Sequence, residues 1–163
     1  MWPPPGIEHS SIRTLVLVAG GVGINPLMSM ISHIHQTNSF PKTVHFLYST
    51  RRPSAESEID DILFVRRLSS IADSKSVEGR LRLSLFLTGE KDDKRIDKTR
   101  GRLNVQKRRI AEQDLLACMG GVEDREGTVC YICGPSGMTD EFVDLVKEMP
   151  GMNEKGVFIE KWW

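Results

Sequence analysis

The sequence contains few of the features that mark secreted, membrane-spanning or nucleic-acid-binding proteins. Its 163 residues include three cysteines and no Asn-X-Ser/Thr sequon, which argues against a secreted domain built on disulfides. No apolar run approaches the roughly 18 residues of a membrane-spanning helix, and no secretory signal pattern opens the chain. The 22 Lys and Arg residues balance 22 Asp and Glu residues, so net charge indicates no nucleic-acid or acidic-membrane partner. We therefore expect a soluble intracellular protein.

The composition is that of one folded domain. A hydrophobic fraction of 39% is too high for a disordered chain, and the length suits a single core. Residues 1–11, which include Pro3-Pro4-Pro5-Gly6, favour extended backbone and are predicted to be a linker or the remnant of an interdomain connection. The domain itself is expected to span residues 12–163.

Apolar patterns predict strands and helices in alternation along this domain. Strands are predicted at residues 15–19, 44–48, 81–87, 128–133 and 157–160, with the third nearer an edge. Helical spacing predicts helices that begin near residue 25 and cover residues 57–71, 112–119 and the stretch before Pro150. The charged residues 90–102 are interpreted as a solvated loop. The alternation predicts an α/β fold: a doubly wound, five-stranded parallel sheet with helices on both faces.

A glycine-rich turn follows the first predicted strand and opens the first predicted helix. It resembles the dinucleotide-binding pattern G-x-G-x-x-G with proline in the last place, and it comprises Gly20, Gly21, Val22, Gly23, Ile24, Asn25 and Pro26. Glycines admit phosphate oxygens close to backbone N–H groups, and the positive end of the helix dipole lies at the same place. We expect this turn to bind a pyrophosphate, with Asn25 as the helix N-cap, although tight turns also need glycine for steric reasons.

The end of the second predicted strand bears on which dinucleotide such a site prefers. The acidic residue that NAD-binding proteins place there is missing, and Ser49, Thr50, Arg51 and Arg52 stand in its place. Their hydroxyl and guanidinium groups could hold an adenosine ribose or a 2′-phosphate, or belong to an ordinary surface loop. The choice between NADH and NADPH therefore stays open.

A second loop of small residues follows the fourth predicted strand. It comprises Cys133, Gly134, Pro135, Ser136, Gly137 and Met138. In a doubly wound sheet, ligands bind at the carboxyl ends of the strands where the strand order reverses. If the first and fourth strands are neighbours at that point, this loop faces the glycine turn across one crevice, and its small residues let a flat ring lie against the backbone.

Together the two loops resemble those of the NAD(P)-binding domain in the ferredoxin–NADP reductase superfamily. Members carry G-G-x-G-x-x-P after the first strand, matched by residues 20–26, and C-G-P-x-x-M after the fourth, matched by residues 133–138. The second-strand end, residues 48–51, and the acidic and aromatic C-terminus, residues 160–163, are similar as well. The resemblance spans about residues 15–163. It implies the domain of a flavin-dependent oxidoreductase that binds NAD(H) or NADP(H) and presents nicotinamide for hydride transfer to FAD on a β-barrel domain.

The resemblance also implies roles for individual residues. Cys133 would lie near the reacting carbon of the nicotinamide, Glu160 would help to hold the site, and the terminal Trp163 would stack on the flavin or its adenine. The family's flavin-binding string R-x-Y-S/T is absent from this sequence, so FAD is expected on a flavin-binding domain supplied in cis or in trans. On this interpretation the chain is half an enzyme and inactive alone, with its electron acceptor unspecified. Similarity to one branch of the superfamily further implies a mitochondrial location.

Three points stay open or negative on the sequence alone. The missing flavin string also fits a free-standing module that binds or senses a nicotinamide nucleotide without redox chemistry. The family's Gly-Arg-Ile/Leu string corresponds either to residues 101–103 or to residues 108–110. Cys130 and Cys133 are expected on opposite faces of a strand, and the two histidines of the first helix are poorly spaced for a shared ion, so no metal site is predicted.

Overall fold

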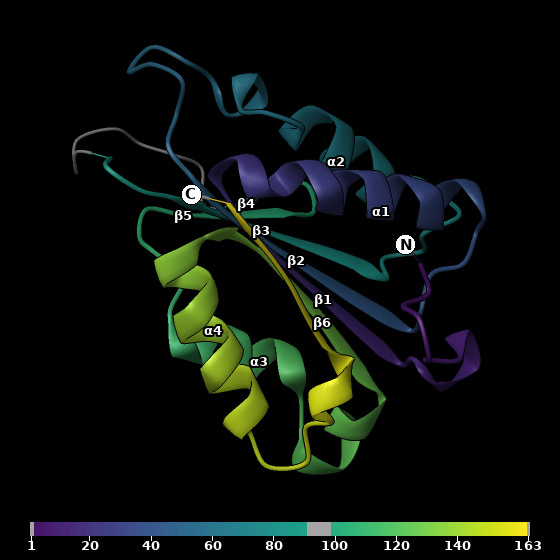
Figure 1. Ribbon diagram of the computed structural model, residues 1–163. Helices are drawn as coiled ribbons and strands as arrows, with labels where there is room; N and C mark the ends of the chain where they lie inside the picture. The colour runs from purple at the N-terminus through teal and green to yellow at the C-terminus, as the bar shows by residue number, and fades with distance from the viewer. Residues whose placement is uncertain (1, 91–98, 163) are drawn as a thin grey trace.

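The computed structural model describes residues 2–90 and 99–162, which form a central twisted sheet between two layers of helices (Figure 1). In this part of the chain the sheet has seven strands, in the spatial order β4-β5-β3-β2-β1-β6-β7. All neighbours pair in parallel except β4, which runs antiparallel to β5. The strands are β1 (Thr14–Gly20), β2 (Thr43–Thr50), β3 (Leu81–Leu87), β4 (Thr99–Arg100), β5 (Leu103–Gln106), β6 (Thr128–Pro135) and β7 (Val157–Trp162).

Each face of the sheet is packed under its own pair of helices. Helices α1 (Ile24–Gln36) and α2 (Val65–Ala72) cover one face, and α3 (Glu112–Met119) and α4 (Ser136–Glu148) cover the other (Figure 1). Because side chains alternate along a strand, residues 15–19 of β1 contribute in turn to both cores and are all fully buried. The α/β doubly wound architecture expected from the sequence is therefore confirmed.

The order of the strands places a topological reversal at β1. From β1 the chain adds β2, β3 and β5 on one side of the sheet and then crosses to add β6 and β7 on the other. The first and fourth predicted strands are thus neighbours, with Ala19 opposite Cys133 in the register. In open α/β sheets this reversal is where the loops diverge and leave room for a ligand.

The prediction of five strands is wrong, because the sheet also contains β4 and β5. Strand β5 was not recognised because Leu103 and Val105 are its only apolar residues, too few to establish an alternating pattern. Strand β3 consequently lies between β2 and β5 and not at the edge of the sheet. Most of the charged segment interpreted as a solvated loop, residues 91–98, lies outside the described residues.

Two helices begin at places that differ from the prediction. Helix α2 begins at Val65 and not at residue 57, because Phe64 adopts a left-handed conformation with φ of 63° that no α-helix continues through. Helix α1 continues directly from the 3₁₀ turn Gly21–Gly23, so Gly23 is its N-cap and Asn25 lies inside the first turn. The Asn25 side-chain amide donates a hydrogen bond to the Val22 carbonyl, at 2.9 Å, and the prediction of Asn25 as the N-cap is wrong.

The segment before β1 is attached to the domain by an aromatic residue. Trp2 is 7% exposed, shares the core beneath α1, and meets the ring of His9 edge-on with centroids 5.8 Å apart. Whether residues 1–11 once connected two domains stays a prediction. Nowhere in the described ranges does a helix have both the length and the apolarity needed to cross a bilayer.

The half-buried histidine of β2, His45, makes the stability of the fold depend on pH. Burial, together with the positive charge of Arg82, lowers the pKa of His45 to about 4. Between about pH 6.5 and pH 4 the unfolded chain therefore binds a proton that the folded chain excludes, so stability falls with pH across this window. Urea titrations should show the free energy of unfolding dropping by about 1–2 kcal/mol more in the native sequence than in His45→Gln between about pH 7.5 and pH 5.

A matched control uses His33→Gln, because His33 is an exposed histidine on α1. This variant should retain the full pH dependence of the native sequence. An equal drop in all three proteins would show that His45 is not responsible.

Candidate functional site

A cleft of about 840 Å³ opens beside the reversal, at the carboxyl ends of the strands. Seven of the residues proposed from the sequence line it: Gly20, Gly21, Ser49, Thr50, Arg51, Pro135 and Met138. The other proposed residues of the two loops are neighbours of these in sequence but do not line the cleft: Val22, Gly23, Ile24, Asn25, Pro26, Cys133, Gly134 and Ser136. The structure thus brings both predicted loops to one cleft, while the role of each residue stays a prediction.

The two loops touch each other through their backbones. A Cβ atom placed on Gly23 would lie 2.3 Å from the Cys133 carbonyl oxygen and 2.9 Å from the Gly134 nitrogen. No side chain fits in that space, so the residue that precedes α1 must be glycine for the turns to meet. The close approach fixes the glycine turn against the end of β6.

The Met138 side chain packs between the two turns, against Gly20 and Gly134. Its Cε and Sδ atoms would both lie 2.9 Å from a Cβ on Gly20, and its Cε would lie 2.4 Å from a Cβ on Gly134. The side chain thus packs over both glycines and also lines the cleft. The methionine of the second loop therefore has a packing role that its position in the motif does not reveal.

An aromatic residue at the end of β7 lies against the glycine turn. Gly21 has φ of 53°, a left-handed conformation that favours glycine, and a Cβ there would lie 3.4 Å from Cζ2 of Trp162. Trp162 pairs with Pro135 across the strands and lines the cleft, and its Nε1 is buried without a partner in the described part of the chain. Trp163, the residue proposed from the sequence, lies outside the described residues.

Cys133 and Glu160 are partners on adjacent strands of the sheet. Their register pairs them directly, and the Cys133 Sγ lies 4.0 Å from the Glu160 Oε2. Burial, reinforced by the negative charge of Glu160, raises the pKa of the Cys133 thiol to about 12. The sulfur is therefore a neutral thiol at physiological pH and is unsuited to nucleophilic attack. Cys130 faces the opposite core, as the strand alternation predicted.

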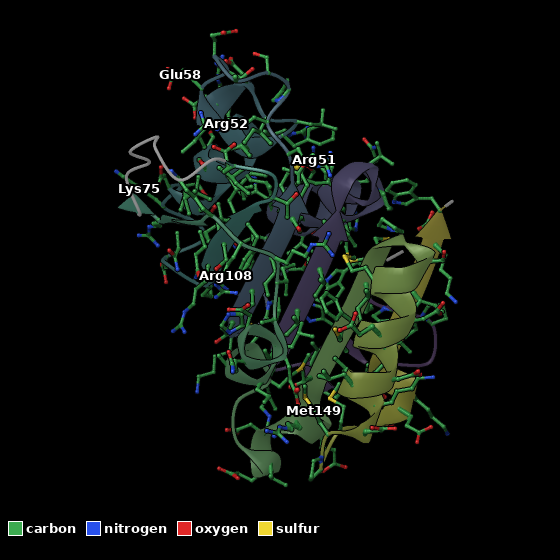
Figure 2. The ribbon with its side chains drawn as sticks, turned by 90° about the vertical axis from the view of Figure 1, so that its left-hand side faces the viewer. Arg51, Arg52, Glu58, Lys75, Arg108 and Met149 are labelled. Carbon is green, nitrogen blue, oxygen red and sulfur yellow. The ribbon has the colours of Figure 1, made fainter. Side chains whose placement is uncertain are left out.

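The two arginines that follow β2 have different environments. Arg52 is mostly buried, forms an ion pair with Glu90 at 3.0 Å, and donates a hydrogen bond to the Ser57 carbonyl at 2.7 Å. Arg51 lies at the same edge of the sheet and lines the cleft (Figure 2), and its guanidinium has no ion-pair or hydrogen-bond partner within residues 2–90 and 99–162. Arg52 thus holds the loop, and Arg51 faces the space that a ligand would occupy.

The structure decides which arginine string belongs to the cleft. Residues 101–103 form the turn into β5, where Arg102 lies 3.8 Å from the Asp73 carboxylate and outside the cleft. Arg109 and Ile110, in the loop that leads from β5 to α3, both line the cleft. The second of the two possible strings is therefore the one placed at the candidate site.

A model of the oxidoreductase NAD-binding domain family matches residues 17–144. The chain belongs to this family. The match includes the glycine turn, the β2 end, the loop before α3 and the second loop, and it confirms the resemblance to the ferredoxin reductase superfamily drawn from the two motifs.

Among curated proteins the domain is similar to oxidoreductase NAD-binding domain-containing protein 1 from several vertebrates. The Xenopus tropicalis protein is 28% identical over 152 residues, a span that covers 91% of this chain and 45% of that protein. The human protein is 28% identical over 162 residues, covering 93% of this chain and 46% of that protein. The chain thus spans less than half the length of these relatives.

Solved structures share the fold of this NAD-binding domain. The flavohemoglobin from Malassezia yamatoensis with bound FAD and heme has a TM-score of 0.65 at 20% identity, covering 96% of this chain and 33% of that one. The NAD+ form of the CS-b5R domains of human Ncb5or also has a TM-score of 0.65, at 19% identity, covering 96% of this chain and 39% of that one. These likenesses show the fold alone.

Several residues that line the cleft lie outside the motifs from which the site was predicted. Thr88 follows β3, Glu141 and Phe142 lie on α4 outside any motif, and Trp162 precedes the proposed Trp163. Helical spacing could have identified Glu141 and Phe142, because they lie one turn beyond Gly137 and Met138 on the same helix. Thr88 reaches the cleft because β3 pairs with β2, a pairing that no local pattern encodes.

Substitution of Gly23 by alanine should separate the two loops. Its methyl group would overlap the Cys133 carbonyl, and both groups are backbone, so the turns must move apart. We expect Gly23→Ala to lower the free energy of unfolding by about 2 kcal/mol or more, as overpacked sites do. Urea denaturation followed by circular dichroism measures the change.

Gly137→Ala is the matched control in the second loop. A Cβ on Gly137 meets no atom within 4 Å, and the residue lies in the first turn of α4. Its stability should stay within about 1 kcal/mol of the native value or rise. A Gly23→Ala variant as stable as Gly137→Ala would contradict the tight contact between the loops.

Proposed function

We propose that this domain binds a nicotinamide dinucleotide in the cleft and presents the nicotinamide for hydride transfer to FAD held by a flavin-binding domain. The observation that carries the proposal is the contact of the glycine turn with the C-G-P-x-x-M loop at the reversal of the sheet. Membership of the oxidoreductase NAD-binding domain family supports nucleotide binding. The flavin part rests on the resemblance of the two loops to the ferredoxin–NADP reductase superfamily, and a reductase is among the relatives: NADH-cytochrome b5 reductase 2 of Candida glabrata is 27% identical over 139 residues.

The cleft suits each part of such a dinucleotide. The pyrophosphate would lie on the turn formed by residues 20–26, at the positive end of α1. The adenosine ribose would lie near Ser49 and Arg51, and the nicotinamide near Pro135 and Met138. Ser49 and Thr50 offer hydroxyls, and Arg51 offers a guanidinium with no ion-pair partner in the described ranges, so both NADH and NADPH are candidates.

The protein's contribution to the chemistry would be to position groups and exclude water. The dinucleotide, when bound, supplies the hydride. Buried Cys133 holds an uncharged thiol at the end of β6, and Glu160 beside it is an exposed carboxylate at the edge of the sheet. Trp162 closes the side of the glycine turn. Buried Cys133 and half-buried Trp162 would keep the reacting face dry and oriented, because the rate of a transfer depends on holding the two cofactors in near-contact.

The resemblance to the ferredoxin–NADP reductase superfamily favours a flavin acceptor over a substrate oxidised within this domain, although Glu141, a carboxylate able to act as a general acid or base, lines the cleft. Among the described residues that line the cleft, none is a His, Lys or Tyr able to exchange a proton with an alcohol or carbonyl substrate. A free-standing nucleotide-binding or sensing module is the alternative, with the same cleft and no transfer. The two functions differ when a separate flavin-binding domain is added together with NADH or NADPH. A domain that transfers hydride would then reduce FAD, and a free-standing binding module would not.

Titration of the purified chain with NADH and NADPH tests nucleotide binding. Gly21→Val places a branched side chain in a left-handed conformation and against Trp162, exactly where the pyrophosphate is proposed to lie. We expect the native chain to bind at least one of the two nucleotides and Gly21→Val to weaken the binding about tenfold or more, which corresponds to about 1.4 kcal/mol. Quenching of tryptophan fluorescence or calorimetry reports the dissociation constant.

Gly101→Val controls for backbone strain alone. Gly101 has φ of 58°, close to the value at Gly21, but a Cβ there meets no atom within 4 Å and the residue lies outside the cleft. The control should bind nucleotide as the native chain does. Equal binding by Gly21→Val and the native chain would refute the pyrophosphate assignment.

A further inference from the structure

The loop that leads from β5 into α3 forms one wall of the cleft and is fixed by a single carboxylate. Arg108 donates from Nη1 and Nη2 to the two oxygens of Asp114, at 2.6 and 2.7 Å. The backbone N–H of Ala111 donates to the same carboxylate at 2.7 Å. Asp114 therefore binds the residues on both sides of Arg109 and Ile110, which line the cleft.

Further contacts restrict the loop on its arginine side. The Arg108 guanidinium lies over the ring of Phe86, 5.1 Å from the centroid, and its Nη1 donates to the Arg109 carbonyl at 3.0 Å. Arg108 lies beside the sheet (Figure 2). Its hydrogen bonds hold the pKa of the Asp114 carboxyl below its usual range, so the carboxylate stays charged and the bidentate pair persists.

Capping of a helix explains only part of this arrangement. An acidic residue in the first turn that accepts from the backbone N–H preceding the helix stabilises many helices, and the bond from Ala111 to Asp114 is of that kind. Capping does not require a second, bidentate partner that is also bonded to the carbonyl of the intervening residue. The additional bonds from Arg108 act on the loop, and what the loop carries into the cleft is Arg109.

Arg109 is placed to meet an anion. Its backbone is fixed, while its exposed side chain has no ion-pair or hydrogen-bond partner within the described ranges. Arg51 reaches the same cleft in the same unpaired state, and Glu141 is the acidic residue that lines it. Two guanidinium groups that have no ion-pair partner among the described residues, against one lining carboxylate, match a ligand that carries phosphate groups.

We infer that Arg109 binds a phosphate group of the nicotinamide dinucleotide and that Asp114, acting through Arg108 and Ala111, is the residue that positions it. This inference rests on the proposed function. Arg109 would touch the nucleotide, and Asp114 would act only through the loop. The effect of Asp114 on affinity should therefore depend on the presence of Arg109.

A double-mutant cycle on the full chain measures that dependence with NADH and NADPH as the probes. Arg109→Gln should weaken binding of the preferred nucleotide about tenfold, and Asp114→Asn should weaken it about three- to tenfold. In the Arg109→Gln background, Asp114→Asn should change affinity less than about twofold. Equal effects of Asp114→Asn in both backgrounds would overturn the positioning role, because a purely structural loss does not need Arg109.

Two further variants keep the test decisive. Arg108→Lys retains the charge but loses the bidentate geometry, so it should repeat the Asp114→Asn result even if that variant folds poorly. Arg102→Gln removes an exposed arginine outside the cleft and should bind as the native chain does. If the native chain binds and Gly21→Val does not, but Arg109→Gln binds normally, the inference fails and the proposed function stands. If the native chain binds neither nucleotide, the proposed function fails.

Discussion

The candidate site depends on one close approach between two backbones. Gly23 meets the Cys133 carbonyl because β1 and β6 are adjacent and parallel, so that their carboxyl ends deliver two turns to the same place. A side chain at Gly23 would prevent the contact, and the two turns would then no longer be fixed relative to each other. With the contact made, helices α1 and α4 both begin at the reversal of the sheet (Figure 1). The cleft lies beside this reversal.

The parts of the fold that could be predicted are those in which burial alone determines the pattern. Residues 15–19 form a strand that is covered on both faces, and a continuous apolar run has no other common explanation in an α/β chain. Strand β5 escaped prediction because pairing with β3, and not its own composition, makes it a strand. The start of α2 was missed for a related reason: the backbone reverses at Phe64, a residue whose side chain gives no hint of a left-handed conformation.

The site divides in the same way between local and long-range information. Residues 20–26 and 133–138 lie in motifs, and the structure places both motifs at one cleft. Thr88 and Arg109 reach it only because β3 is added next to β2 and β5 next to β3, a fact of topology that spacing along the chain does not contain. The choice between Trp162 and Trp163 depends most directly on long-range information. The register of β7 on β6 pairs Trp162 with Pro135 and so brings Trp162 to the glycine turn, and neither neighbour could be preferred without that register.

The charges of the cleft illustrate why composition says little about a binding site. The chain has no net charge. Its cations nevertheless differ in whether they form an ion pair with an acidic side chain. Arg52, Arg108 and Lys161 have acidic partners in Glu90, Asp114 and Asp140, and each pair joins a loop or strand end to a neighbouring element. Arg51 and Arg109 stand beside the first two of these in sequence, line the cleft, and have no such partner in the described part of the chain. In the pairs Arg51-Arg52 and Arg108-Arg109, one arginine holds the loop through an ion pair with a carboxylate, and the other lines the cleft and is available to a ligand. The electrostatic field of the cleft is thus set by which arginines are paired, and only the folded arrangement determines that.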